Sequence, residues 1–287
     1  MSAAHLWYWD GAYYTEGAAV LSLDNRAFRY GDALFESIRV VQGRPCFLEA
    51  HLARLRHGSE RLGLRHQEDL YALVAQLLHR SGTTSGRLRM CLTRKSGGLY
   101  APQQQMGIVG AEISPVEPST YPTWQHGLKV GRLANHRVGD TILNGLKSAN
   151  ALTYVMAGKA CRELGWDEGL LTNHRGEIVE GYSSNLWVWK DGQLSTPSLQ
   201  YGGVAGVIRQ LLLESRYGWP LPVQARAIHP DELSTADEIW LTNAIQGIRW
   251  VADYEGRELT GQKAVEMQEK LREMALSSAK DLPGSWP

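Results

Sequence analysis

The 287-residue sequence has few cysteines, no excess of one charge and no long apolar run. Its three cysteines, Cys46, Cys91 and Cys161, are odd in number, far apart and never in a Cys-x-x-Cys pair. This spacing argues against a disulfide framework and against a zinc site. Lysine plus arginine equals aspartate plus glutamate at 30 each, so no global charge indicates nucleic acid or an anionic membrane as a partner.

Two further absences concern location. No apolar stretch approaches the roughly 20 residues of a membrane span. The N-terminal Met-Ser-Ala-Ala-His has no basic region and no apolar signal region. We therefore expect a soluble, cytoplasmic protein. Aromatic residues, in contrast, are plentiful: ten tryptophans and twelve tyrosines need burial in a core or between subunits.

Strand and helix patterns alternate along the chain, which predicts a mixed α/β (α+β) fold of two domains. Residues 113–122 contain three prolines and interrupt the pattern. We expect a small N-terminal domain at 1–115, a linker at 116–124 and a larger C-terminal domain at 125–287. Strands are expected at 5–14 (a hairpin), 33–41 and 45–48 (joined by a turn at Gly43), 86–94, 128–133, 168–172, 186–189 and 238–242, and helices at 49–63, 71–79, 147–164, 206–215 and 262–274.

Lys147 stands at the start of one expected helix, in Leu143-Asn-Gly-Leu-Lys147-Ser-Ala-Asn150. A partly desolvated lysine forms imines and transfers protons, because burial lowers its pKa. Taken alone, such a lysine is more often solvated. Glu180 follows in Glu180-Gly-Tyr-Ser-Ser-Asn185. A carboxylate can keep a pyridine nitrogen protonated, although Glu180 alone also fits a surface glutamate in a hairpin.

A phosphate group needs hydrogen-bond donors, and three segments offer them. The stretch Gly202-Gly203-Val-Ala-Gly206-Val-Ile-Arg209 leads directly into an expected helix, whose N-terminal amides suit an anion. Arg54 offers a bidentate cation, although it also fits a helix-surface arginine. Thr242-Asn243-Ala244 ends an expected strand with short polar groups. Together with Lys147 and Glu180, these segments predict a pyridoxal phosphate site.

The order of the motifs resembles the fold-type IV pyridoxal phosphate enzymes, also called class IV aminotransferases. This family includes branched-chain aminotransferases, D-amino acid aminotransferases and 4-amino-4-deoxychorismate lyases. The resemblance implies a small and a larger α/β domain, a homodimer with sites near its interface, and amino acid and 2-oxo acid substrates. The motifs are Arg26-x-x-x-Tyr-Gly-Asp32, Glu49-x-His-x-x-Arg-Leu55, Lys147-Ser-x-Asn150, Glu180-Gly-x-Ser-Ser-Asn185 and Gly206-Val-Ile-Arg209.

The resemblance also implies roles for single residues. Lys147 is expected to form the Schiff base and to act as the catalytic acid and base. Glu180 is expected to bind the ring nitrogen and Arg54 the phosphate. The complete set of expected cofactor-binding residues is Arg54, Lys147, Glu180, Ser184, Asn185, Gly206, Val207, Ile208, Asn243 and Ala244.

A substrate carboxylate is typically bound by arginine, tyrosine or backbone amides. Arg87 and Arg89 lie two apart on one expected strand and so point to the same face. Solvated arginines on an edge strand are an equally good explanation. In the family that the chain resembles, the loop of Arg29 and Tyr30 reaches the partner's site. We predict substrate contacts from Arg29, Tyr30, Phe35, Arg87 and Arg89, with Arg29 and Arg89 on the carboxylate.

The motifs point to more than one reaction. The loop 93–102 lacks the Arg-x-His pair of D-amino acid aminotransferases, and Ala151 stands where branched-chain enzymes usually have tyrosine. Ser96-Gly-Gly-Leu-Tyr-x-Pro102 and Thr242-Asn-Ala-Ile-Gln-Gly247 resemble the lyases, whereas Phe35-Glu-Ser-Ile-Arg39 resembles the transaminases. We predict a transaminase, with D-amino acids slightly favoured. The alternative is a 4-amino-4-deoxychorismate lyase that releases pyruvate and 4-aminobenzoate. The intact set of Lys147, Glu180 and Arg54 argues against a third hypothesis, a non-enzymatic binding role.

Overall fold

A computed structural model describes residues 6–15, 21–139, 141–214 and 218–278. The chain divides into two compact units. Unit 1 consists of Met1–Thr120, Lys147–Asn150 and Arg272–Pro287, and unit 2 of Tyr121–Leu146 and Ala151–Leu271. The expected mixed α/β fold is confirmed. The domain limits expected from the sequence, 1–115 and 125–287, stay a prediction.

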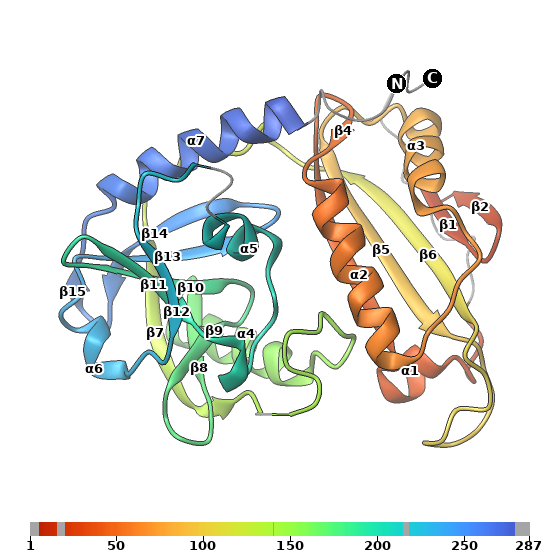
Figure 1. Ribbon diagram of the computed structural model, residues 1–287, viewed down its shortest axis with the longest axis horizontal. Coiled ribbons are helices and arrows are strands. Elements are labelled where there is room, and N and C mark those ends of the chain that lie inside the picture. Colours follow the sequence, from red (N-terminus) through yellow and green to blue (C-terminus); the bar gives the residue numbers. More distant parts are fainter. Residues whose placement is uncertain (1–5, 16–20, 140, 215–217, 279–287) are drawn as a thin grey trace. The chain divides into compact units, whose positions relative to one another are not determined.

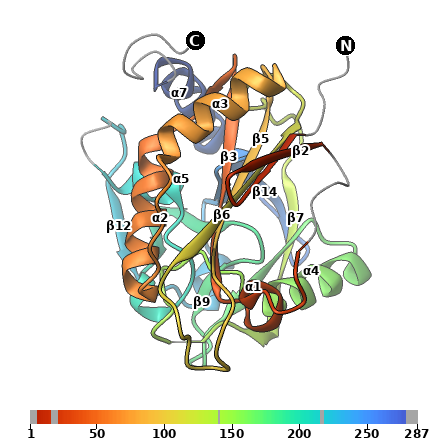
Figure 2. The same cartoon turned by 90° about the vertical axis from the view of Figure 1, so that its right-hand side faces the viewer.

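Unit 1 is built on a six-stranded antiparallel sheet in the order β2-β1-β6-β5-β3-β4 (Figure 1). Helices α2 and α3 cover one of its faces, as two views show (Figures 1 and 2). The elements are β1 (Leu6–Trp9), β2 (Ala12–Thr15), α1 (Arg26–Tyr30), β3 (Ala33–Val41), β4 (Arg44–Pro45), α2 (Leu48–Leu62), α3 (Leu70–Ser81), β5 (Gly86–Arg94) and β6 (Gly107–Pro115).

The strands of unit 1 separate an apolar face from a polar one. On β5, Leu88, Met90 and Leu92 are buried, whereas Arg87 is exposed and Arg89 half-buried. This alternation follows from the two-residue period of a strand. The predicted shared face of Arg87 and Arg89 is therefore present, and it is the face opposite the buried leucines.

Unit 2 contains a nine-stranded sheet in the order β12-β11-β10-β13-β14-β7-β8-β9, and β15 pairs with β14. Its strands are β7 (Leu128–Arg137), β8 (Glu168–Thr172), β9 (Ile178–Gly181), β10 (Asn185–Lys190), β11 (Gln193–Pro197), β12 (Val223–Arg226), β13 (Glu238–Asn243), β14 (Gly247–Tyr254) and β15 (Arg257–Glu258). The helices are α4 (Leu152–Leu164), the 3-10 turn η1 (Leu199–Tyr201), α5 (Val207–Leu213), α6 (Pro230–Leu233) and α7 (Gln262–Ser278), whose last residues from Arg272 belong to unit 1.

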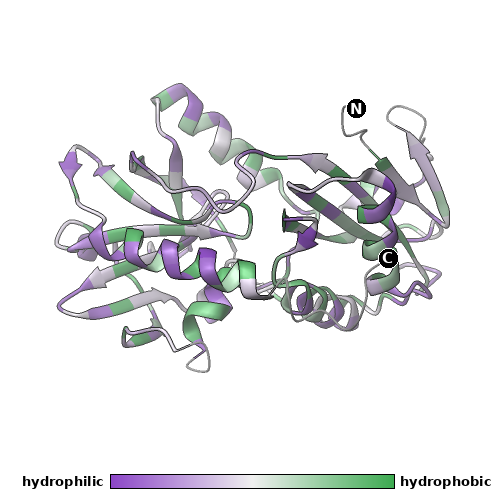
Figure 3. Ribbon diagram, turned by 90° about the horizontal axis from the view of Figure 1, so that it is seen from above, coloured by the Kyte–Doolittle hydropathy of each residue, from purple (hydrophilic) through white to green (hydrophobic). Residues whose placement is uncertain are grey.

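The larger core cluster of unit 2 consists mainly of strand residues, and a second cluster lies where α4 packs on the sheet. Trp187 and Trp240 are completely buried, and each indole N–H has a partner, Thr242 Oγ1 at 3.1 Å and Glu238 Oε2 at 2.7 Å. Buried tryptophan normally needs such a partner. Figure 3 shows that the helices carry both hydrophobic and hydrophilic residues along their length. Among the described residues, no helix has the length and apolar character needed to cross a membrane.

The helix expected from Lys147 begins only at Leu152, so that prediction was wrong. Residues 147–149 instead pair with the start of β3. The N–H of Phe35 donates to the Lys147 carbonyl at 3.0 Å, and the N–H of Ala149 donates to the Ala33 carbonyl at 2.8 Å. These backbone groups are committed to the sheet and are therefore not available to a helix. No strand was expected from the sequence at the position of β6, because the nearby prolines indicated a linker.

Candidate cofactor site

Lys147 lies against an aromatic ring of unit 1. Its Nζ is 4.3 Å from the centroid of the Phe35 ring, and the backbone bonds to β3 fix its position. The guanidinium carbon of Arg89 lies 4.4 Å from the same ring centroid. A cation this close to an aromatic face is attracted by the ring quadrupole. The structure therefore brings together Lys147, Phe35 and Arg89, three of the residues predicted from the sequence.

The other predicted substrate residues have different surroundings. Arg29 is exposed, and its Nε donates to the Leu23 carbonyl at 2.9 Å. The Tyr30 ring contacts the Tyr100 ring, with centroids 5.6 Å apart. Arg87 is exposed on β5. The contacts of Arg29 and Tyr30 are thus with the surroundings of α1, rather than with Phe35 or Lys147.

Arg54 forms a buried ion pair with Glu36. Its Nε donates to Glu36 Oε1 at 2.8 Å, and its Nη2 contacts Oε2 at 2.5 Å. His51 shares this carboxylate through Nδ1 at 2.7 Å. Burial by itself would raise the pKa of Glu36, but Arg54 and His51 outweigh it and lower the pKa to about 2. The predicted phosphate arginine is therefore held in a fixed orientation by a carboxylate.

The motif that begins at Arg26 anchors a loop. Asp32 accepts hydrogen bonds from Arg26 Nε at 2.8 Å and Arg94 Nε at 2.9 Å. Arg26 Nη1 also donates to the carbonyls of Gly97, Gly98 and Leu99. Asp32 offsets part of the cost of burying both cations, because its carboxylate pairs with each of them. This cluster fixes the Ser-Gly-Gly-Leu-Tyr loop on which the lyase-like resemblance partly rests.

Glu180, on β9 of unit 2, is 3% exposed and accepts several hydrogen bonds. Tyr154 Oη donates to its Oε1 at 2.7 Å. Asn185 Nδ2 and the Val204 N–H donate to Oε2 at 3.1 and 3.0 Å. A buried carboxylate with such donors is stabilised in its ionised form. Two predicted residues, Glu180 and Asn185, are thus in direct contact.

Glycine is required beside this carboxylate. Gly203 has φ +89°, and a Cβ there would lie 3.2 Å from the Glu180 carboxyl and 3.0 Å from Val179. At Gly206 a Cβ would lie 1.9 Å from Asn185 Oδ1. Gly206 is followed directly by α5, which no side chain caps. The first amides of a helix, here including Val207 and Ile208, have no intrahelical acceptor and suit an anion.

The remaining predicted residues belong to a polar network. Ser184 Oγ donates to Glu168 Oε2 at 3.0 Å, and Ser183 binds the same carboxylate through its N–H at 2.9 Å and its hydroxyl at 2.7 Å. Burial raises the pKa of Glu168, and these serines oppose the shift. Asn243 Oδ1 accepts from the N–H groups of Ile245 and Gln246. The Ala244 carbonyl accepts from Tyr121 Oη at 2.7 Å.

Three acidic or phenolic partners were missed from the sequence: Glu36, Tyr154 and Glu168. Glu36 and His51 lie within the family motifs given above. The sequence does not indicate that their side chains pair with each other. Tyr154 lies two residues into α4, and nothing in its sequence context distinguishes it from a core aromatic. Glu168 begins the expected strand 168–172, and nothing in its sequence context points to Ser183 or Ser184 as partners. In each case the importance of the residue follows from a contact with a residue distant in sequence, which no local pattern indicates.

The residues present fit pyridoxal phosphate chemically. Lys147 supplies a primary amine placed over an aromatic ring. Glu180 supplies a buried carboxylate whose neighbours are hydrogen-bond donors. Arg54 and the uncapped start of α5 supply the positive groups that a phosphate needs. The individual roles of these residues stay predictions.

Comparison with known proteins gives the family. Residues 33–254 match the amino-transferase class IV family. The chain is 26% identical over 285 residues to a putative branched-chain-amino-acid aminotransferase of Methanocaldococcus jannaschii, covering 97% of this chain and 96% of that one. The crystal structure of 4-amino-4-deoxychorismate lyase from Pseudomonas aeruginosa has a TM-score of 0.80 and 35% identity, with 93% and 98% of the two chains covered.

A third relative shows the fold. The structure of a branched-chain aminotransferase from Thermoproteus uzoniensis has a TM-score of 0.88 at 22% identity, with 96% of each chain covered. The fold-type IV architecture expected from the motifs is thus confirmed. The match to the family model spans most of the chain. This protein belongs to the class IV aminotransferase family and is a pyridoxal phosphate enzyme.

Proposed function

We propose that the protein is a lyase that converts 4-amino-4-deoxychorismate to 4-aminobenzoate and pyruvate. The observation that carries this proposal is the 35% identity to the Pseudomonas aeruginosa lyase over 93% of the chain. The putative branched-chain aminotransferase shares 26%. This preference reverses the order that the motifs suggested, in which transamination came first.

The proposed reaction needs only a few side chains, mainly Lys147 and Glu180. Bound pyridoxal phosphate supplies an electron sink that acidifies the C–H beside the substrate amine. Lys147 binds the cofactor and removes that proton, because a positioned amine is an effective general base. The bond between the ring carbon and the ether oxygen then breaks, so the oxygen leaves with the enolpyruvyl group, whose methylene carbon gains a proton. Pyruvate leaves, and the six-membered ring becomes aromatic. Glu180 would bind the pyridine nitrogen of the cofactor and favour its protonated form.

The polar face of the unit 1 sheet suits this substrate. Aminodeoxychorismate carries two carboxylates and an unsaturated ring. Arg89 offers a planar guanidinium that matches a carboxylate, and Phe35 beside it offers an apolar face. We propose Arg89 as a carboxylate contact and Phe35 as the surface beside the substrate ring. Arg87, on the same face and more exposed, is proposed as an auxiliary cation.

Transamination is the second candidate. The 26% identity to a putative aminotransferase extends over 97% of the chain. The similarity is therefore not limited to one shared motif. In that reaction Lys147 would remove the proton from the substrate carbon and act again as the acid, the bound cofactor would carry the amino group, and a 2-oxo acid would leave. D-amino acids remain the slightly preferred donors in this alternative, because of the arginines on the unit 1 sheet and because Ala151 stands where branched-chain enzymes usually have tyrosine.

One experiment separates the two reactions. The purified protein with pyridoxal phosphate is given 4-amino-4-deoxychorismate, and 4-aminobenzoate and pyruvate are quantified. Parallel reactions contain D-alanine or L-leucine with 2-oxoglutarate. Equimolar 4-aminobenzoate and pyruvate, with no amino transfer, is the expected outcome. Rapid glutamate formation without 4-aminobenzoate would replace the lyase proposal with transamination.

We further propose that the protein is a homodimer, as its family resemblance implies. The exposed apolar residues of unit 1 around α1 and its loop, Leu23, Phe28 and Leu99, are consistent with a covered surface. Sedimentation velocity over a concentration series tests the assembly, and a monomer throughout would contradict it.

A further inference from the structure

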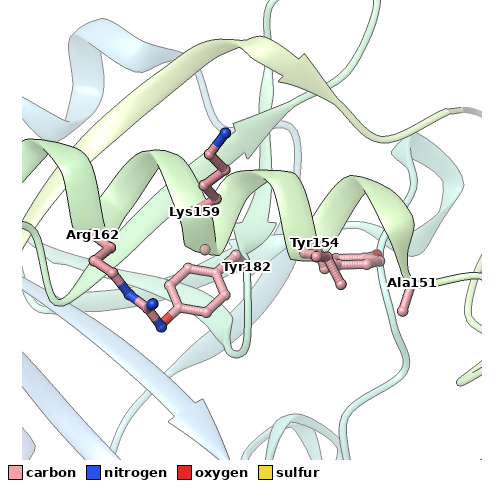
Figure 4. A pocket seen from close by; sticks show the side chains of 7 residues that line it. Ala151, Tyr154, Lys159, Arg162 and Tyr182 are labelled. Atoms are coloured by element: carbon pink, nitrogen blue, oxygen red, sulfur yellow. The ribbon is translucent and has the colours of Figure 1, made fainter.

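A pocket of unit 2 lies beside α4. It is lined by residues of α4, including Lys159 and Arg162, together with Ala151 and Tyr182 (Figure 4). Tyr154 is one of the lining residues, and its hydroxyl is 2.7 Å from Glu180 Oε1. One phenol thus separates a buried carboxylate from an open surface pocket.

Tyr154 binds Glu180 as a neutral donor. Burial and the neighbouring Glu180 carboxylate both raise the pKa of the phenol, so it keeps its proton. Asn185 Nδ2 and the Val204 N–H both donate to the other oxygen, Oε2. A hydrogen bond to an ionised carboxylate lowers that group's basicity. Tyr154 therefore acts on the oxygen that Asn185 and Val204 do not touch.

We propose that Tyr154 is a positioning residue that tunes the basicity of Glu180, and thereby the share of the proton held by the pyridine nitrogen of the cofactor. The inference rests on the proposed contact of Glu180 with that nitrogen, and it applies to lyase and transaminase chemistry alike. A more basic Glu180 draws the proton away from the ring. The pyridine ring then withdraws electron density less strongly. As a result, the nitrogen that joins Lys147 to the cofactor becomes more basic.

A purely structural role for Tyr154 predicts something different. Its ring packs against a buried cluster that includes Leu133, Ala157 and Leu171. If packing were its only contribution, removing the hydroxyl while keeping the ring would leave the cofactor's electronic properties unchanged. Loss of the hydroxyl alone therefore separates the two roles.

The test compares Tyr154→Phe with Tyr182→Phe. Tyr182 lines the same pocket, but its hydroxyl faces the Asp167 carbonyl at 3.4 Å and does not touch Glu180. The readout is the pH titration of the cofactor absorbance band in the holoenzyme. We expect its apparent pKa to rise by about one unit in Tyr154→Phe, the size of a charge-assisted hydrogen bond, and to stay at the wild-type value in Tyr182→Phe. The turnover number should fall roughly tenfold with little change in KM.

A second variant keeps the test decisive if Tyr154→Phe does not fold. Tyr154→3-fluorotyrosine retains the ring and the hydroxyl but makes the phenol a stronger donor, so the apparent pKa should fall below the wild-type value. Unchanged titration in both variants would overturn the role of Tyr154. A wild-type protein that binds pyridoxal phosphate without an absorbance titration would instead contradict the proposed cofactor contacts. A wild type that titrates but releases no 4-aminobenzoate would contradict only the lyase reaction.

Discussion

The Nζ of Lys147 lies 4.3 Å from the centroid of the Phe35 ring. The lysine reaches this ring because its backbone pairs with β3, the strand that carries Phe35. A cation at this distance from an aromatic face is attracted by the ring quadrupole, which helps to hold the amine in place. The same ring contacts Arg89 at 4.4 Å. The Lys147 amine and the Arg89 guanidinium, the groups proposed to bind the cofactor and a substrate carboxylate, thus both contact the Phe35 ring.

Replacing Lys147 by alanine should abolish turnover, because no other side chain is proposed to bind the cofactor covalently or to move the substrate proton. We expect a loss of at least roughly a thousandfold, together with loss of the protein-bound cofactor absorbance. Lys129→Ala is the control, since Lys129 is exposed on β7. Substantial turnover in Lys147→Ala would remove Lys147 from the mechanism.

Arg89→Ala should weaken substrate binding, since it removes a charge-assisted contact to a carboxylate. We expect KM to rise roughly tenfold or more with a smaller change in the turnover number. Arg87→Ala, on the exposed position of the same strand, should raise KM less. Steady-state kinetics with 4-amino-4-deoxychorismate measures both variants. An equal, small effect at the two positions would mean that neither arginine binds the substrate.

Glu36 should make the protein sensitive to acid. Its pKa is about 2 in the folded protein, lowered from 4.5. A depressed folded-state pKa contributes stability that is present above the unfolded value and is lost as the pH falls through the folded one. The contribution is about 3 kcal/mol and disappears between roughly pH 5 and pH 2. Urea unfolding at a series of pH values measures it.

In Glu36→Gln this dependence should shrink, and the protein should already be less stable at pH 7 because Arg54 loses its buried partner. Glu60→Gln, on the exposed side of α2, is the control and should retain the wild-type acid dependence. If Glu36→Gln lost stability with acid as steeply as the wild type, the ion pair would not be the cause.

Gly203→Ala should impair cofactor binding as well as stability. Gly203 and Gly192 both have positive φ, +89° and +77°, but only at Gly203 would a Cβ contact other atoms, including the Glu180 carboxyl at 3.2 Å. Both alanine variants should lose about 1 kcal/mol of unfolding free energy from backbone strain. Only Gly203→Ala should also raise the Kd for pyridoxal phosphate, measured by fluorescence titration. Equal cofactor affinity in the two variants would contradict the contact.

Local chemistry made much of the fold predictable. The two-residue alternation on β5 and the leucine spacing of α2 follow from burial of one face, and the structure has both elements. The local structure around Lys147 was harder to predict. The residues after it favour a helix, and only the pairing with β3 keeps 147–149 out of that helix. The strand β6 was hidden by the prolines at its end, since local turn signals outweighed a pairing that only the sheet provides.

The sequence by itself determined the family and the cofactor, because the motifs around Lys147, Glu180 and Gly206 combine residue types that few other chemistries need together. Only the tertiary structure decided which groups these residues meet. Arg54 meets Glu36, and Glu180 meets Tyr154, across 18 and 26 positions of sequence. Such pairings depend on how strands and helices pack, and packing brings together positions that no local pattern connects.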